Sequence, residues 1–165
     1  MLECLVFASQ SSKIKARQNL SPSEKLPTLE VKGNWETQTQ KIAQIRKQLP
    51  ILVWQSAGIC RNEEVMQAAI TQINFWREDV RNLEMGKYVL HLPPNQTVNL
   101  TSEEGEEQLK LYGETLNLVD VAYLILKSAA FRRESRGGHY RSDYPETLPE
   151  WQVHTLVQGE DWKKA

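Results

Sequence analysis

The sequence predicts a mainly α-helical protein, a three-helix antiparallel bundle with an N-terminal arm and a short C-terminal strand. Apolar residues recur every three or four positions in three stretches between residues 34 and 136, which places them on one face of a helix. Proline and glycine interrupt the chain between those stretches. We therefore expect an N-terminal remnant and linker at 1–33, the bundle at 34–136, and a C-terminal turn with a strand or tail at 137–165.

The composition is that of a soluble globular protein, with 165 residues, 25% of them charged, and a net charge of −1. This charge provides no overall field to recruit nucleic acid or an anionic membrane. No apolar run approaches the roughly 20 residues needed to span a bilayer. Cys4 and Cys60 are too few for a disulfide scaffold or a zinc site, and we expect Cys60 to be a small packed residue. A cytoplasmic protein without metal is the expectation.

The first 34 residues predict no helix that is stable on its own. Residues 2–8 are apolar and helix-compatible, but they are too few to offset the cost of nucleation. Residues 9–34 are polar and contain Pro22, Pro27 and Gly33, which favours a linker or arm.

The first helix of the bundle is expected to begin at Asn34, a good N-cap, and to end at Gly58. Pro50 has no N–H to give to the carbonyl four residues earlier, so we expect the helix to kink or restart there. Its apolar stripe consists of Ile42, Ile45, Leu49 and Leu52.

The second helix is expected to begin after the N-cap Asn62 and to stop at Gly86. Glu63 and Glu64 suit its first turn, where the helix dipole is positive. Its stripe comprises Val65, Ala69, Ile73, Trp76, Val80 and Leu83. Residues 86–105 follow as a long surface connection, with a short extended piece expected at 87–92.

The third helix has the clearest pattern, an apolar seam with spacings of three and four. The seam comprises Leu109, Tyr112, Leu116, Val119, Tyr123, Leu126 and Ala130. Gly137 or Gly138 is expected to supply a left-handed cap at its end. Across the three helices, Trp35, Trp54 and Trp76 are expected in or at the edge of the core.

After Pro149, residues 151–157 alternate between apolar and polar side chains, which predicts one strand. A single strand is not stable, so this one needs a pairing partner from another region or another chain.

The end of the third helix runs into an unusually dense set of polar groups. Four arginines and one histidine fall within residues 132–141, together with Glu134 and followed by Asp143. Three interpretations compete: solvated charges at a helix end, an anion site made of guanidinium groups, or a surface that docks on another domain. The alternation of glycine, aromatic and charged residues favours docking.

The motifs of common catalytic sites are missing from the sequence. There is no G-x-G-x-x-G, P-loop or H-E-x-x-H motif and no Cys/His cluster, which argues against a dinucleotide, triphosphate or metal site within the chain. Ser135, His139 and Asp143 contain the residue types of a catalytic triad, but no nucleophile-elbow pattern surrounds the serine.

Three segments resemble one known family. Residues 134–145 (ESRGGHYRSDYP) resemble the C-terminal signature of the succinate dehydrogenase/fumarate reductase flavoprotein family, and its L-aspartate oxidase branch most closely. Residues 54–61 (WQSAGICR) are similar to that family's helix end, which runs into Gly-Ile-x-Arg. Residues 2–8 resemble the segment that follows the last flavin contacts. The three matches occur in the family's order, which makes the resemblance more specific than any one of them.

The resemblance implies the C-terminal helical domain of an enzyme that uses FAD to oxidise L-aspartate to iminoaspartate, a step toward quinolinate and NAD. The family's flavin-binding and substrate-binding residues would lie before Leu2. No catalytic, cofactor-binding or metal-binding residue is therefore carried over, and the chain alone is expected to hold no FAD and to be inactive. The expected partner is the N-terminal flavin domain. The residues expected to dock on it are Glu134, Ser135, Arg136, Gly137, His139, Arg141 and Asp143.

Two other functions remain open at this point. One is a stand-alone helical module that binds a partner protein through the same turn. The other is the C-terminal domain of a succinate dehydrogenase or fumarate reductase flavoprotein subunit. A homodimer is compatible with each of them.

Overall fold

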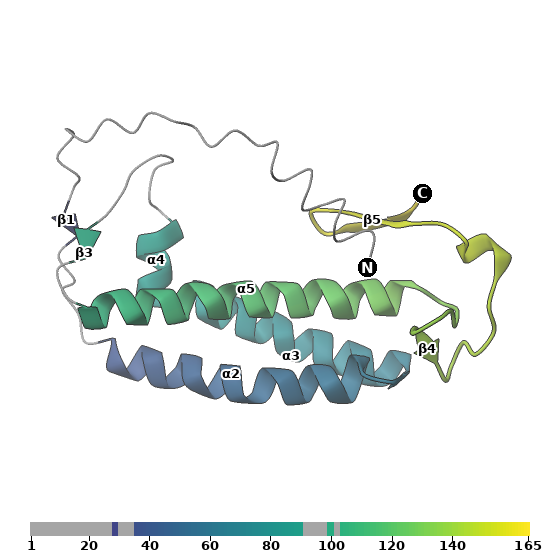
Figure 1. Cartoon of the computed structure of the whole chain (residues 1–165), viewed down its shortest axis with the longest axis horizontal. Coiled ribbons are helices and arrows are strands. Elements are labelled where there is room, and N and C mark those ends of the chain that lie inside the picture. The colour runs from purple at the N-terminus through teal and green to yellow at the C-terminus, as the bar shows by residue number, and fades with distance from the viewer. Residues whose placement is uncertain (1–27, 30–34, 91–98, 101–102) are drawn as a thin grey trace.

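A computed structural model describes residues 28–29, 35–90, 99–100 and 103–165 (Figure 1). The N-terminal segment expected at 2–8 and most of the expected linker lie outside these residues. Within the linker, strand β1 (Thr28–Leu29) pairs in parallel with β3 (Asn99–Leu100).

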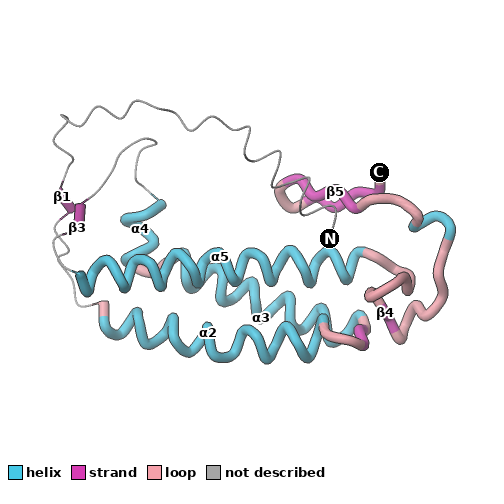
Figure 2. Tube along the Cα trace, viewed as in Figure 1, coloured by secondary structure: helices cyan, strands magenta, loops and turns pink. Residues whose placement is uncertain are grey.

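Three long helices form the bundle: α2 (Glu36–Ala57), α3 (Glu63–Arg81) and α5 (Glu103–Phe131). Helices α2 and α5 run in the same direction and α3 runs back against both, as Figures 1 and 2 show. The core lies between them, and the predicted stripes supply most of it: its fully buried members include Ile42, Ile73, Val80, Tyr112, Val119 and Leu126. Val65, predicted in the stripe of the second helix, is exposed, so that part of the prediction is wrong. The predicted mainly α-helical bundle is confirmed.

Of the kink or restart expected at Pro50, the restart is wrong, because α2 continues through this residue. Pro50 is exposed, so its ring and the carbonyl that it leaves unbonded lie on the solvent side, where water can satisfy the carbonyl. Gly58 is the C-cap, as expected, and donates its N–H to the carbonyl of Trp54. Trp35 and Trp76 are buried, but the prediction that Trp54 belongs to the core is wrong, because its side chain is 68% exposed.

Helix α3 begins as predicted, with the side chain of Asn62 accepting a hydrogen bond from the N–H of Val65 at 2.9 Å. It ends at Arg81, earlier than expected. A short helix, α4 (Glu84–Leu90), follows, so the extended piece predicted at 87–92 is wrong over residues 87–90. Gly86 is buried inside α4 and does not stop α3.

The C-terminal segment forms a hairpin. A 3-10 turn, η1 (Pro149–Trp151), leads to β5 (Thr155–Gln158), which pairs antiparallel with β6 (Asp161–Lys164). The strand partner that the sequence left open is thus the next segment of the same chain. The strand predicted at 151–157 begins only at Thr155, so the prediction is wrong for residues 151–154, the first of which belongs to η1. The hairpin packs on α5 through Trp162, whose indole N–H donates to the hydroxyl of Ser128 at 3.1 Å.

Candidate functional site

The arginine-rich turn is attached to the start of α3 by a two-residue parallel pairing. Strand β2 (Cys60–Arg61) pairs with β4 (Tyr140–Arg141), so that Arg61 lies opposite Arg141. The N–H of Ser142 extends the pairing with a 2.9 Å bond to the carbonyl of Arg61. This register places Arg141 beside the first turn of α3 and below the end of α5. Cys60 is exposed in β2, which contradicts the prediction that it is packed.

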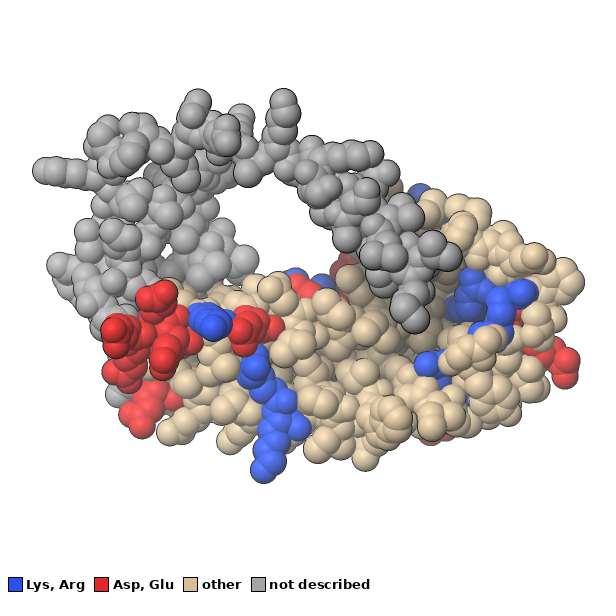
Figure 3. All heavy atoms as spheres, in the orientation of Figure 1, with Lys and Arg blue, Asp and Glu red and all other residues tan. Residues whose placement is uncertain are grey.

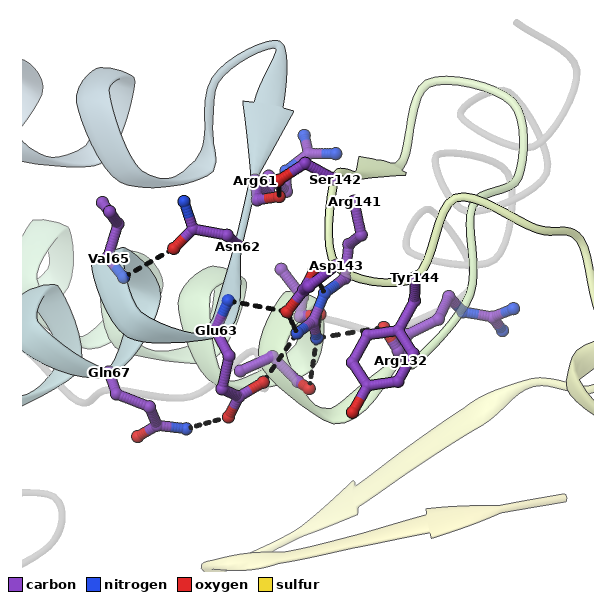
Figure 4. A network of polar contacts seen from close by, with 12 residues as sticks. Arg61, Asn62, Glu63, Val65, Gln67, Arg132, Arg141, Ser142, Asp143 and Tyr144 are labelled. Carbon is purple, nitrogen blue, oxygen red and sulfur yellow. Dashed lines mark hydrogen bonds and ion pairs between the residues drawn. The ribbon is translucent and has the colours of Figure 1, made fainter.

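Arg141 joins two helix ends through one fully buried side chain (Figure 4). Its Nη2 donates to Glu63 at 2.7 Å and to Asp143 at 2.5 Å, and its Nε donates to Asp143 at 2.9 Å. Its Nη1 donates to the carbonyl of Ala130 in the last turn of α5 at 2.8 Å. We call Glu63, Arg141 and Asp143 the arginine clamp.

The charges of the arginine clamp match the dipoles of the helices that it joins. Asp143 accepts a 2.9 Å bond from the N–H of Glu63, at the positive start of α3, while Arg141 lies at the negative end of α5. The hydrogen bonds from Arg141 outweigh burial and lower the pKa of Asp143 to about 2. Burial alone would lower the pKa of Arg141, but its bonds to Asp143 and Glu63 raise it. All three groups therefore stay charged at neutral pH.

A second ionic group surrounds Glu134, which is fully buried. Arg136 donates to both of its carboxylate oxygens, at 2.9 and 3.1 Å, and Arg132 donates to one of them. The N–H of Leu148 adds a bond at 2.9 Å. The bonds from Arg136, acting against burial and aided by Leu148 and Arg132, lower the pKa of Glu134 to about 2. We call Glu134, Arg132 and Arg136 the Glu134 cluster.

His139 lies between the two halves of the turn. Its Nε2 is 3.2 Å from the carbonyl of Arg132, and its Nδ1 is 3.3 Å from Nη1 of Arg61. Because a carbonyl accepts and a guanidinium donates, these partners fit a neutral ring protonated on Nε2. Burial lowers the pKa of His139; the bond to the Arg132 carbonyl opposes this, and the charges of the nearby arginines add to the lowering. The ring is thus uncharged at neutral pH and is held in one orientation by these two contacts.

The glycine pair forms the tip of a tight hairpin. Arg136 and His139 exchange two backbone hydrogen bonds, at 2.8 and 3.0 Å, across Gly137 and Gly138. Gly137 has a φ of 55°, as a two-residue turn with glycine at its first central position requires. The expected helix cap is therefore wrong: α5 ends six residues before Gly137, and the glycines shape a turn instead.

Ser135 does not form a nucleophilic triad with His139 and Asp143. Its hydroxyl donates to the carbonyl of Tyr144 at 2.8 Å and accepts from the N–H of Arg141 at 2.9 Å. Asp143 accepts from Arg141, and the ring nitrogens of His139 contact Arg61 and the carbonyl of Arg132, not Ser135. These bonds hold the backbone of the turn in place.

The seven residues predicted as a docking set thus come together in one turn, but most of their polar atoms point into the domain. Gly137 and Asp143 are exposed residues, and the side chain of Arg136 is 37% exposed, so these three members reach the surface. Solvated helix-end charges do not describe Glu134 and Arg141, which are fully buried. Sequence reasoning assigned no role here to Arg61 or Glu63. Arg61 is the last residue of the WQSAGICR segment that resembles the family, and this resemblance could have indicated that Arg61 belongs to the site.

Within the described ranges, no group of three or more His, Cys, Asp and Glu side chains could hold a metal ion. Over the same residues, no helix has both the length and the apolar character that crossing a bilayer requires.

One known protein family matches the part of the chain that contains the arginine-rich turn and the helices that it joins. Residues 46–165 match the family model for the fumarate reductase flavoprotein C-terminus. The chain belongs to this family. The match contains α3, α5, the arginine clamp, the Glu134 cluster and the C-terminal hairpin.

Several curated relatives extend the likeness over nearly the whole chain. The L-aspartate oxidase of Nostoc sp. is 46% identical over 98% of this chain, and that of Synechocystis sp. is 43% identical over 96%. The succinate dehydrogenase flavoprotein subunit of Rickettsia bellii is 26% identical over 94%. The chain spans 29% of the length of each of the two oxidases and 26% of the dehydrogenase subunit.

Proposed function

We propose that this chain is the C-terminal helical domain of an FAD-dependent L-aspartate oxidase. In this role it contributes to the oxidation of L-aspartate to iminoaspartate, a cytoplasmic step that leads to quinolinate and NAD. The observation that carries the proposal is the 46% and 43% identity to two L-aspartate oxidases along nearly the whole chain.

The domain's part in this reaction is structural. The flavin and the substrate are held by a flavin domain, and the helical domain packs on it. The seven residues of the turn support this packing mostly from inside. The Glu134 cluster and the arginine clamp fix the path of the backbone on both sides of Gly137, so the glycine tip meets the partner in one shape. Arg136, Gly137 and Asp143 are exposed enough to permit direct contact as well.

A C-terminal domain of a succinate dehydrogenase flavoprotein subunit is the second candidate. It is favoured by the Rickettsia relatives, which are 26–27% identical over 94% of the chain. The lower identity makes it the weaker of the two.

The test is substrate choice by the complete flavoprotein that contains this chain, purified with its FAD. Aspartate is expected to bleach the flavin absorption band, with peroxide released in air, while succinate leaves the band unchanged. Bleaching by succinate and not by aspartate would establish the second candidate. Bleaching by neither substrate would contradict both.

A further inference from the structure

One side of the bundle, formed by α2 and α5, has almost no charge along half its length. No charged residue occurs on α2 from Gln48 to its end at Ala57. On α5 the single charged residue between Thr115 and Leu126 is Asp120. Its carboxylate is bonded to Arg77 of α3 at 2.7 Å and to Arg81 at 2.9 Å, so it belongs to a different side of the bundle.

The uncharged parts of the two helices lie side by side. Arg46 on α2 contacts Glu114 on α5 at 3.2 Å, and the two helices run in the same direction (Figure 1). Because both rise about 1.5 Å per residue, position 50 falls beside 118, position 53 beside 121, and position 57 beside 125. We call this surface the α2/α5 face.

The α2/α5 face exposes large apolar side chains in a row. The exposed fractions are 68% for Trp54, 45% for Leu118, 51% for Val121 and 47% for Ile125. In Figure 3, which has the orientation of Figure 1, this face is a broad area without charged atoms over the middle of α5 and the adjoining part of α2. Red and blue atoms lie toward its ends. Soluble monomers rarely expose contiguous apolar patches larger than a few hundred Å².

The face ends in a groove against the glycine tip. A groove of about 650 Å³ runs between Trp54 at the end of α2, with Ile59 just after that helix, and the tip at Gly137, Gly138 and Tyr140. The hairpin bonds and the Glu134 cluster hold the tip in position. A partner lying on the α2/α5 face would thus meet a preformed edge.

We propose that the α2/α5 face, bounded by the glycine tip, is the surface on which the larger part of the flavoprotein packs. The inference rests on the proposed function and identifies the surface through which this domain contacts the flavin-containing part. The two oxidases match this chain over 96–98% of its length, yet the chain spans 29% of them. Most of each relative therefore lies outside this domain and is joined to it. The contact on this chain is mainly apolar and uncharged, and the fully buried Glu134 and Arg141 stabilise its edge from inside.

The test compares the reactivity of single cysteines in the 165-residue chain and in the complete flavoprotein. In both, Cys4→Ser and Cys60→Ser remove the native thiols of this chain, and labelling is quantified by mass spectrometry on the peptide that carries the new cysteine. Val121→Cys then reports on the α2/α5 face. Ala68→Cys, exposed on α3, is the matched control. A bulky maleimide is expected to react with Val121→Cys at least tenfold more slowly in the flavoprotein than in the chain alone, and with Ala68→Cys at similar rates in both.

Three results would overturn the inference. Equal rates for Val121→Cys in the two proteins would mean that the flavin-containing part packs elsewhere. Slow labelling in the chain alone that speeds up on dilution would assign the face to a second copy. Slow labelling in the chain alone that does not change on dilution would assign it to residues 1–34 of the same chain. The flavin-bleaching assay is independent, so a protected Val121→Cys in a protein inert to aspartate would contradict the proposed activity but not the docking surface.

Discussion

The guanidinium group of Arg141 lies 2.7 Å from the carboxylate of Glu63, although the two residues are 78 positions apart in the sequence. The contact joins the last turn of α5 to the first turn of α3. The arginine-rich turn is therefore part of the structural framework of the bundle, because it holds two of its helices together.

Replacing Arg141 with Met is expected to destabilise the domain by about 3 kcal/mol. This is the low end of the range for breaking a buried ion pair, because Glu63 and Asp143 can still reach solvent. Urea unfolding followed by circular dichroism measures the change. Arg133→Ala, an exposed arginine in the same segment, should change stability by less than about 0.5 kcal/mol. A loss below 1 kcal/mol for Arg141→Met would contradict the role of the clamp.

The Glu134 cluster predicts a loss of stability in acid. The pKa of Glu134 is lowered to about 2 in the folded protein, and the pKa of Asp143 to a similar value. The stabilisation from such carboxylates is fully present above their ordinary pKa and is lost as pH falls through the folded value. The free energy of unfolding should therefore decrease between about pH 4.5 and pH 2. In Glu134→Gln this decrease should be smaller, whereas Glu150→Gln, at an exposed position, should keep it.

His139 predicts a second pH dependence at higher pH. Burial lowers its pKa in the folded protein below the ordinary 6.5, so the unfolded chain takes up a proton first as pH falls. Stability is then full above about pH 6.5 and declines below it. Unfolding measured at pH 7.5 and pH 5.5 should show this decline in the native protein and not in His139→Gln. His154→Gln, at an exposed position, should behave as the native protein does.

The glycine tip offers a matched pair of substitutions. Gly137→Ala should cost about 1–2 kcal/mol, because its φ of 55° is left-handed and an L side chain is strained there. Gly138→Ala should cost much less, since nothing lies within 4 Å of an added Cβ and its φ is not left-handed. Thermal unfolding of the two variants is sufficient to compare them. Equal melting temperatures would contradict the assigned turn.

Gly86 and Gly113 form a second pair, in helices. A Cβ at Gly86 would lie 2.5 Å from the hydroxyl of Tyr112 and 2.6 Å from the carbonyl of Arg81, so Gly86→Ala should destabilise by roughly 1–3 kcal/mol through overpacking. A Cβ at Gly113, in the middle of α5, has open space. Gly113→Ala should therefore stabilise by up to about 1 kcal/mol through helix propensity. If the urea midpoints of Gly86→Ala and Gly113→Ala both shift in the same direction relative to the native protein, the packing described at these two glycines is wrong.

The helices could be predicted because their information is local. The spacing of Ile42, Ile45 and Leu49, or of Tyr112, Val119 and Leu126, repeats within each helix and needs no knowledge of other segments. The same spacing does not distinguish apolar residues that face the core from apolar residues on a docking surface. Trp54 and Val121 continue helical apolar patterns, yet they are exposed, because a surface that binds a partner has the same periodicity as one that faces the core.

The interior of the turn could not be predicted, because its contacts join distant segments. The sequence shows that Arg141 has carboxylates available, but the choice of Glu63 depends on the pairing of β2 with β4, which no local pattern encodes. The C-terminal hairpin was missed for a different reason. The alternation at residues 151–157 predicts one strand only, but Gly159, with a φ of 60°, lies between two short strands, and a glycine in that place is a hairpin signal.

The 78-residue separation between Glu63 and Arg141 also bears on how the domain comes apart. A contact that closes so long a stretch of chain costs considerable entropy, so it is expected to form after the helices have assembled. Interactions that form late have little effect on the speed of assembly and mainly slow the reverse process. The buried arginine would then act as a latch, setting how long each folded molecule survives before it opens.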